Sequence, residues 1–356
     1  MGNDHSRNQG ANHDEIRSVS LQLRAARRRL LSAFILVIAI AGCAPGRVFD
    51  TLPPDTATRA IANTEAPTSL FVADSGSITV YGLAKGHYVR RISDPSPTAL
   101  TTDREGNLFV ADFDANTVTV YARGTGSVLR VITQGLHEPR AVALDSAGNL
   151  YVANHQNNTV TVYSPGSESV LRTISEGLNG PHALIFARNG DLFVGSNGSG
   201  HITVYPPGGV HVVRTVVTHN GPLALGINQA GDLFSVNNFN ITVYKPGHTS
   251  PDRIISDGID LPSTLAFDSN GNLYVANWGP NMLRSFISIY PPGGSMPTRE
   301  ISRGISNPLS LALISNGSLI VANAGSNTVS EYGPAGRLER TITSHVRNPS
   351  AIAIGP

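Results

Sequence analysis

The stretch DSAGNLYVANHQNNTVTVY, from Asp145 to Tyr163, decides the fold of this chain. It holds a Gly-Asn turn, an apolar run that ends at Asn154, a short polar segment, and a second apolar run that ends at Tyr163. Short runs of β-branched and aromatic residues bounded by Gly and Asn are typical of β-strands joined by tight turns. The stretch therefore predicts two neighbouring strands.

The apolar phrase at the centre of this stretch recurs along the chain, with spacings of 38, 42, 42, 41, 40 and 46 residues. A period of about 40–45 residues with four strands per unit is typical of the blades of a β-propeller. The seven copies of the phrase begin at Phe71, Phe109, Tyr151, Phe193, Phe234, Tyr274 and Ile320.

Each repeat predicts four strands. The first follows a proline, the second carries the recurring phrase, the third ends on a tyrosine, and the fourth carries Arg-x-Ile or Arg-x-Val. The tyrosine and the arginine are nine residues apart in six copies and eight apart in the last. Because the fourth strand is the outermost of a blade, we expect its arginine to discourage edge pairing between molecules.

The two ends of the repeat region predict how the ring closes. The first copy starts directly at its second strand, and the chain ends in an apolar strand, Pro349 to Ile354, that has no following partner. Joining these ends completes one blade and leaves no open edge around the ring. The fold class is therefore all-β, a single seven-bladed propeller of four-stranded blades closed by the C-terminal strand. A six-bladed ring with an irregular extra unit is the alternative.

The repeat resembles those of the bacterial NHL-repeat and YVTN-type propellers. The resemblance covers about residues 67–356 and rests on the motif from Asp145 to Asn154, followed by Asn158-Thr-Val160. The motif implies the fold and no single function, because such propellers host ligand binding, lactone hydrolysis, lyase chemistry and protein interaction.

The N-terminal region predicts export and lipid anchoring. Basic residues between Arg24 and Arg29 precede a 12-residue apolar run, Leu30 to Ala41, that is short for a membrane span. The run leads into Ile40-Ala-Gly-Cys43, which resembles a bacterial lipobox. We therefore expect a lipoprotein signal peptide at 1–42, lipidation of Cys43, and a flexible Pro- and Thr-rich tether at 43–66. An ordinary signal peptide or signal anchor is the alternative.

Composition and charge limit the classes of partner that we expect for this protein. Charged residues make up 14% of the chain and the net charge is +1, so no strong field favours nucleic acid. Cys43 is the one cysteine, which excludes an intramolecular disulfide. We expect a monomer, held by its lipid to a bacterial membrane in the cell envelope, on the periplasmic side or facing the cell surface.

Topology predicts one working face. Antiparallel strands place the loops after the second and fourth strands of every blade on the same side of the ring. The longest of these loops, between Asn277 and Tyr290, contains Trp278, the only tryptophan. A tryptophan in an exposed loop suits contact with a partner. The candidate ligand or partner face comprises Trp278, His182, Arg140 and His155.

Enzymatic chemistry is the weaker prediction. Peptidylglycine amidating lyases have a similar repeat and hold zinc through three histidines, each after the proline that opens a first strand. Here only His182 occupies such a position, and a zinc site needs three protein ligands. We therefore assign no catalytic residue, metal ligand or cofactor. We expect a binding module for a protein, glycan or small ligand, with a metal-assisted lactonase or lyase in the central funnel as the alternative.

Overall fold

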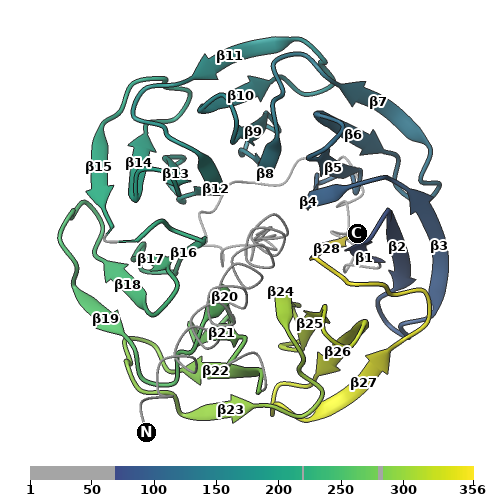
Figure 1. The fold of residues 1–356 in the computed structure, drawn as a ribbon. Coiled ribbons are helices and arrows are strands. Elements are labelled where there is room, and N and C mark those ends of the chain that lie inside the picture. Colours follow the sequence, from purple (N-terminus) through teal and green to yellow (C-terminus); the bar gives the residue numbers. More distant parts are fainter. Residues whose placement is uncertain (1–68, 219, 280–283) are drawn as a thin grey trace, which may run out of the picture. The chain divides into compact units, whose positions relative to one another are not determined.

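The computed structural model describes residues 69–356, apart from 219 and 280–283. The predicted signal peptide (1–42), the tether (43–66) and Cys43 lie outside the described residues. Within them the chain forms seven four-stranded antiparallel sheets arranged as blades around a central axis (Figure 1). The all-β, seven-bladed prediction is confirmed, and the six-bladed alternative is set aside. The described part of the chain contains no helix with the length and hydropathy of a membrane span.

The blades follow the chain in order, and the strand nearest the axis opens all but the first. The strands of blade 1 are β28 (Ala351–Gly355), β1 (Ser69–Asp74), β2 (Ser77–Gly82) and β3 (Tyr88–Ser93). Those of blade 2 are β4 (Pro97–Thr102), β5 (Leu108–Asp112), β6 (Thr117–Tyr121) and β7 (Val128–Ile132). Those of blade 3 are β8 (Pro139–Leu144), β9 (Leu150–Asn154), β10 (Thr159–Tyr163) and β11 (Val170–Ile174). Those of blade 4 are β12 (Pro181–Phe186), β13 (Leu192–Ser196), β14 (His201–Tyr205) and β15 (Arg214–Val217).

The remaining blades repeat this order. The strands of blade 5 are β16 (Ala224–Ile227), β17 (Leu233–Val236), β18 (Ile241–Tyr244) and β19 (Arg253–Ile255). Those of blade 6 are β20 (Pro262–Phe267), β21 (Leu273–Asn277), β22 (Phe286–Tyr290) and β23 (Arg299–Ile301). Those of blade 7 are β24 (Pro308–Leu313), β25 (Leu319–Asn323), β26 (Thr328–Tyr332) and β27 (Leu338–Ile342).

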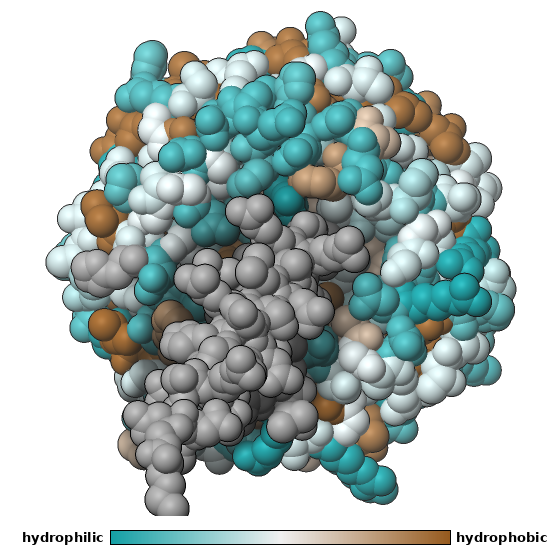
Figure 2. Space-filling model, in the orientation of Figure 1, coloured by the Kyte–Doolittle hydropathy of each residue, from teal (hydrophilic) through white to brown (hydrophobic). Residues whose placement is uncertain are grey.

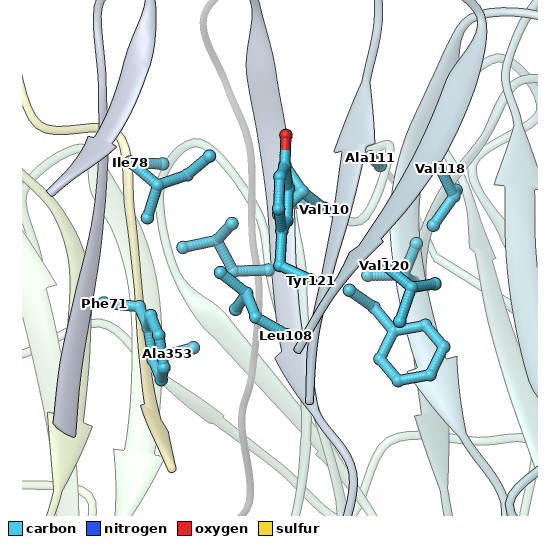
Figure 3. Packing of buried hydrophobic residues seen from close by; sticks show 14 of the residues in the cluster. Phe71, Ile78, Leu108, Val110, Ala111, Val118, Val120, Tyr121 and Ala353 are labelled. Carbon is cyan, nitrogen blue, oxygen red and sulfur yellow. The ribbon is translucent and has the colours of Figure 1, made fainter. Parts of the chain in front are cut away.

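The ring closes through the C-terminal strand, as predicted. β28 pairs antiparallel with β1, and Leu70 lies opposite Ile354. Phe71 and Ala353 face each other in the same pairing (Figure 3). Blade 1 is thus built from both ends of the described chain, so the inner edge of β1 is satisfied.

The core consists of apolar side chains packed between neighbouring blades. Strands β5 and β6 alone supply Leu108, Val110, Val118 and Val120, all essentially inaccessible to solvent (Figure 3). Burial of this kind contributes roughly 25 cal/mol for each Å² of apolar surface removed from water. Each of the five clusters of buried apolar residues that the described residues form spans at least two neighbouring blades, so the core extends across the seams between blades.

The tyrosine that ends each third strand fastens that blade to the preceding one. Tyr163 is fully buried, and its hydroxyl donates to the Gln134 carbonyl oxygen at 2.5 Å, in the loop that enters blade 3. Equivalent hydroxyls donate to the carbonyl oxygens of Ser344, Glu176, Asp257 and Arg303. A buried phenol needs such a partner, which explains why tyrosine recurs at this position.

The arginines of the outer strands contact other strands of their blade or the next blade. Their side chains turn back over the blade, where Arg130, Arg172, Arg214 and Arg253 each place the guanidinium carbon 5.6–5.7 Å from the centroid of an aromatic ring on the second strand. Arg299 and Arg340 instead donate to carbonyl oxygens of the next blade. These contacts join strands within a blade and connect neighbouring blades.

Candidate functional site

The loops after the second and fourth strands are bound to each other on one face of the ring. In blade 3 the His155 amide donates to the Glu138 carbonyl oxygen at 3.1 Å, and in blade 2 the Phe113 amide donates to Ser96 at 3.4 Å. The Trp278 amide makes the matching bond to Leu261 in blade 6 at 3.1 Å. Among the described residues the same backbone bond occurs in six of the seven blades, and this backbone frame holds the first residue after the second strand against the loop that enters the blade.

The polar residue that ends the second strand supports this frame. The Asn154 side-chain oxygen accepts from the His137 amide at 3.1 Å, and its amide group donates to the Thr161 hydroxyl at 3.1 Å. Asn277 and Asn323 bind the amides of Asp260 and Ser306 in the same way. These three asparagines bind the preceding loop, whereas Asn237 at the same position binds the following one and Asp112 binds both. Their role is structural.

A β-bulge at the start of the innermost strand sets the direction of the candidate side chains. In blades 2, 3, 4, 6 and 7 the register shifts between the opening proline and the second residue after it. The residue between them is left out of the pairing. A bulge of this kind changes the direction in which the side chain of the unpaired residue points. Arg140 and His182 occupy this position, and both are largely buried.

Three of the four predicted face residues come together across blades 2, 3 and 4. The Arg140 guanidinium carbon lies 4.1 Å from the centroid of the Phe113 ring, and the His155 and His182 rings meet edge to face with centroids 6.5 Å apart. In both pairs a loop residue of one blade contacts the bulge residue of the next. We call Phe113, Arg140, His155 and His182 the crescent.

Burial shapes the electrostatics of the crescent. Burial lowers the pKa of Arg140, and nearby Glu138 and Asp114 act in the opposite direction. Burial, and then the positive charge of Arg140, lower the pKa of His155 below its usual 6.5. His155 is therefore mainly neutral at pH 7, when its imidazole can accept as well as donate a hydrogen bond. The crescent thus combines an aromatic ring, a cation and two imidazoles.

Trp278 does not have the exposed position that the sequence predicts. Its side chain is 6% exposed, and its indole nitrogen donates to the Pro308 carbonyl oxygen at 3.2 Å, on the opening residue of blade 7. It belongs to blade 6, outside the crescent. The large apolar ring fills the seam between two blades, which is the energetically favoured place for it. Most of the inserted loop, residues 280–283, lies outside the described residues.

Two aromatic residues of this face are missing from the sequence prediction. Phe113 is the loop residue that stacks with Arg140. Phe239, in the corresponding loop of blade 5, is 66% exposed. The signal that could have identified Phe113 is register, because it directly follows the end of its second strand, as His155 and Trp278 do; Phe239 lies two residues further along its loop.

Within 69–356, leaving aside 219 and 280–283, no group of three or more His, Cys, Asp or Glu side chains is arranged to hold a metal ion. Hydrophilic side chains cover much of the described surface in Figure 2, and the apolar patches lie scattered around the rim. Exposed apolar residues such as Leu129, Leu171 and Ile254 belong to outer strands, away from the crescent.

Comparison with known proteins shows the fold. No family model matches the chain, and no curated protein does. A streptogramin B lyase structure aligns with a TM-score of 0.65 at 13% identity, over 82% of this chain and 93% of that one. A functionally unknown protein from Desulfotomaculum acetoxidans DSM 771 aligns with a TM-score of 0.68 at 14% identity, over 81% and 99%. Hydrazine synthase of Kuenenia stuttgartiensis aligns with a TM-score of 0.61 at 19% identity, over 77% and 94%. The chain is similar to these proteins as a seven-bladed β-propeller.

Proposed function

We propose that this propeller is a binding module of a bacterial cell envelope, anchored by a lipid on Cys43, and that its ligand binds at the crescent. The observation that carries the proposal is the pair of contacts that joins three adjacent blades, Arg140 with Phe113 and His155 with His182. A guanidinium and two imidazoles offer several directed hydrogen bonds, and partly buried donors of this kind suit a small ligand with a carboxylate or phosphate group. The NHL- or YVTN-type assignment is part of this proposal.

The asymmetry of the ring supports a site in this sector. At the position directly after the opening proline, which Arg140 and His182 occupy in their blades, the other blades carry small or apolar residues, namely Thr98, Leu223, Ser263, Leu309 and Ser350. A fold that closes well with those residues does not need an arginine and a histidine there. Burying a cation has a desolvation cost, so its presence favours a functional reason.

The test replaces each crescent residue with one that occurs at the same position in another blade, so that the fold is expected to accept it. Arg140→Leu and His182→Ser place at each position a residue that other blades carry there. We expect Arg140→Leu to weaken binding of a small carboxylate or phosphate probe by about 10-fold or more, the scale of a charge-assisted hydrogen bond. Titration calorimetry against a panel of such probes measures this loss.

The matched control is Leu309→Ser, at the same position in blade 7. It should leave probe binding and thermal stability unchanged. Equal binding by Arg140→Leu and the wild type would refute a ligand site at the crescent.

The anchoring part of the proposal has its own test. Cys43→Ala removes the thiol that a lipid transferase would modify. We expect the wild-type protein to sediment with membranes and to incorporate a labelled fatty acid, and the variant to do neither. Incorporation of the label into Cys43→Ala would contradict the assignment of the lipid to this cysteine.

A lyase or lactonase is the second candidate, and the neutral His155 imidazole favours it. Eliminations and lactone openings need a general base and a group that stabilises the developing negative charge. His155 has the lowered pKa of a base at neutral pH, and Arg140 lies close enough to influence it. Turnover of a bound probe, lost in His155→Asn with binding retained, would favour this candidate over simple binding.

A further inference from the structure

The backbone is left-handed directly before the proline that opens the innermost strand in several blades. Gly180, Asn307 and Asn348 have this conformation, with φ of 62°, 49° and 46°, and glycine and asparagine adopt it readily. Glu138 and Leu261 also have it, with φ of 51° and 49°. Residues of these two types are uncommon at positive φ, so a strained position of this kind favours a function for the side chain.

Leu261 belongs to a chain of contacts that crosses from blade 6 to blade 7. Its carbonyl oxygen accepts the Trp278 amide at 3.1 Å, and the Trp278 indole nitrogen donates to the Pro308 carbonyl oxygen at 3.2 Å. Leu309 follows this proline, at the bulge of blade 7. Trp278 is buried in the seam, whereas Leu261 and Leu309 are only half-buried. Two leucines therefore remain partly open to solvent beside a buried indole.

The crescent has the same arrangement at the seam of blades 3 and 4, with polar side chains. The Glu138 carbonyl oxygen accepts the His155 amide at 3.1 Å, and the His155 ring contacts the ring of His182 at the bulge of blade 4. The same three positions thus carry Glu, His and His at one seam and Leu, Trp and Leu at the other. Blade 3 lies across the axis from blades 6 and 7 (Figure 1). One face of the ring therefore has a polar side and an apolar side.

A further apolar side chain of this face lies in blade 5, next to blade 6. Phe239 is 66% exposed, in the loop after β17. The Asn237 side-chain oxygen accepts the amides of Phe239 and Asn240, both at 3.1 Å, and so fixes the turn. A phenyl ring held open to water lacks the free energy that burial would supply. We call Phe239, Leu261 and Leu309 the apolar arc.

We infer that the ligand is an amphipathic anion, with its charged group on the crescent and an alkyl chain that extends over the apolar arc. The crescent supplies charge-assisted hydrogen bonds, and the arc supplies apolar surface that gains free energy once a chain covers it. Arg140 and His182 are 8% and 5% exposed, so a charged group must enter between the blades to reach them. A single dissolved molecule can do so, whereas a flat membrane surface cannot. The inference rests on the proposed function of the crescent and adds the apolar half of the ligand.

A series of straight-chain anions tests the inference. Titration calorimetry with the full chain measures the binding of acetate, hexanoate and decanoate, and of alkyl phosphates of matching length, below the concentrations at which they form micelles. We expect the affinity to rise with chain length, by about fourfold for each methylene group that the arc buries.

Two variants locate the chain on the arc. Leu261→Asn introduces the residue that blades 7 and 1 carry before their prolines, and Phe239→Asn alters an exposed position. Each should lower the affinity for decanoate by about fivefold or more and leave acetate binding unchanged. Leu129→Asn is the matched control, because Leu129 is 52% exposed on an outer strand, and it should keep the full rise with chain length. If Leu261→Asn fails to fold, Phe239→Asn decides the question.

The outcomes separate this inference from the proposed function. Acetate binding that depends on Arg140, with an affinity that is independent of chain length, overturns the amphipathic ligand and leaves a site at the crescent. A rise with chain length that persists in the variants of the arc shows that the chain binds elsewhere, and it overturns the inference. If no alkyl carboxylate or phosphate binds, or if only vesicles of phosphatidylglycerol and phosphatidylcholine bind, the proposed function fails together with this inference.

Discussion

At the scale of single residues, buried hydroxyls and carboxyls determine how neighbouring blades are joined. The seven tyrosines that end the third strands are all buried, and the hydroxyls of six of them donate to a residue in the loop that enters their own blade. Removing one of these hydroxyls leaves a part-buried carbonyl oxygen, or for Tyr121 a carboxyl oxygen, without its donor. The loss is therefore larger than that of a surface hydrogen bond.

Tyr163→Phe tests this role. We expect it to lower the free energy of unfolding by about 1–2 kcal/mol, because the Gln134 carbonyl oxygen loses the donor that lies 2.5 Å away. Urea denaturation followed by circular dichroism measures the change. Tyr88→Phe is the control, since Tyr88 is 41% exposed and its hydroxyl can bind water. If Tyr163→Phe lowers the free energy of unfolding no more than Tyr88→Phe does, within error, the Tyr163 hydroxyl contributes nothing to stability.

Asp94 makes the stability depend on pH. Burial raises its pKa to about 7 in the folded protein, from 3.8 in a free side chain, so the folded state binds the proton more strongly. Its stabilising contribution is complete below pH 4 and decreases as the pH rises to 7. We expect the stability of the wild type relative to Asp94→Asn to fall by on the order of 2–4 kcal/mol over this range. Chemical denaturation of both proteins at each pH measures the difference; a constant difference would contradict the raised pKa.

At the scale of elements, the arginine of the outer strand connects that strand to the rest of its blade. Arg214 lies over Phe193, with the guanidinium carbon 5.6 Å from the ring centroid. We expect Arg214→Ala to lower stability by about 1 kcal/mol through lost stacking and packing of the side-chain stem. A thermal melt measures it. Arg188→Ala, at an exposed turn, should leave the melting temperature unchanged.

The strands and their order were predictable from the sequence, whereas the site was predictable only in part. Period and turn chemistry are local properties, so the repeated phrase around Tyr151 sufficed for the strands. Whether Trp278 is exposed depends on the space between blades 6 and 7, which no local pattern contains. The contact of Phe113 with Arg140 joins residues of different blades, and only the curvature of the ring brings them together.

At the scale of the whole molecule, closure should make the ring fold as one cooperative unit. β28 supplies the inner strand of blade 1, where Ile352 and Ala353 are buried against neighbouring blades. Without β28, β1 has an unpaired inner edge and the ring has two free ends, so every blade loses part of its support. We expect deletion of 351–356 to lower the melting temperature by about 10 °C or more and to broaden the transition. Deletion of Pro356 alone, which lies beyond β28, is the control and should melt like the wild type. A truncated chain that melts sharply at the wild-type temperature would show that the blades do not need closure, and that the seams between blades carry the stability by themselves.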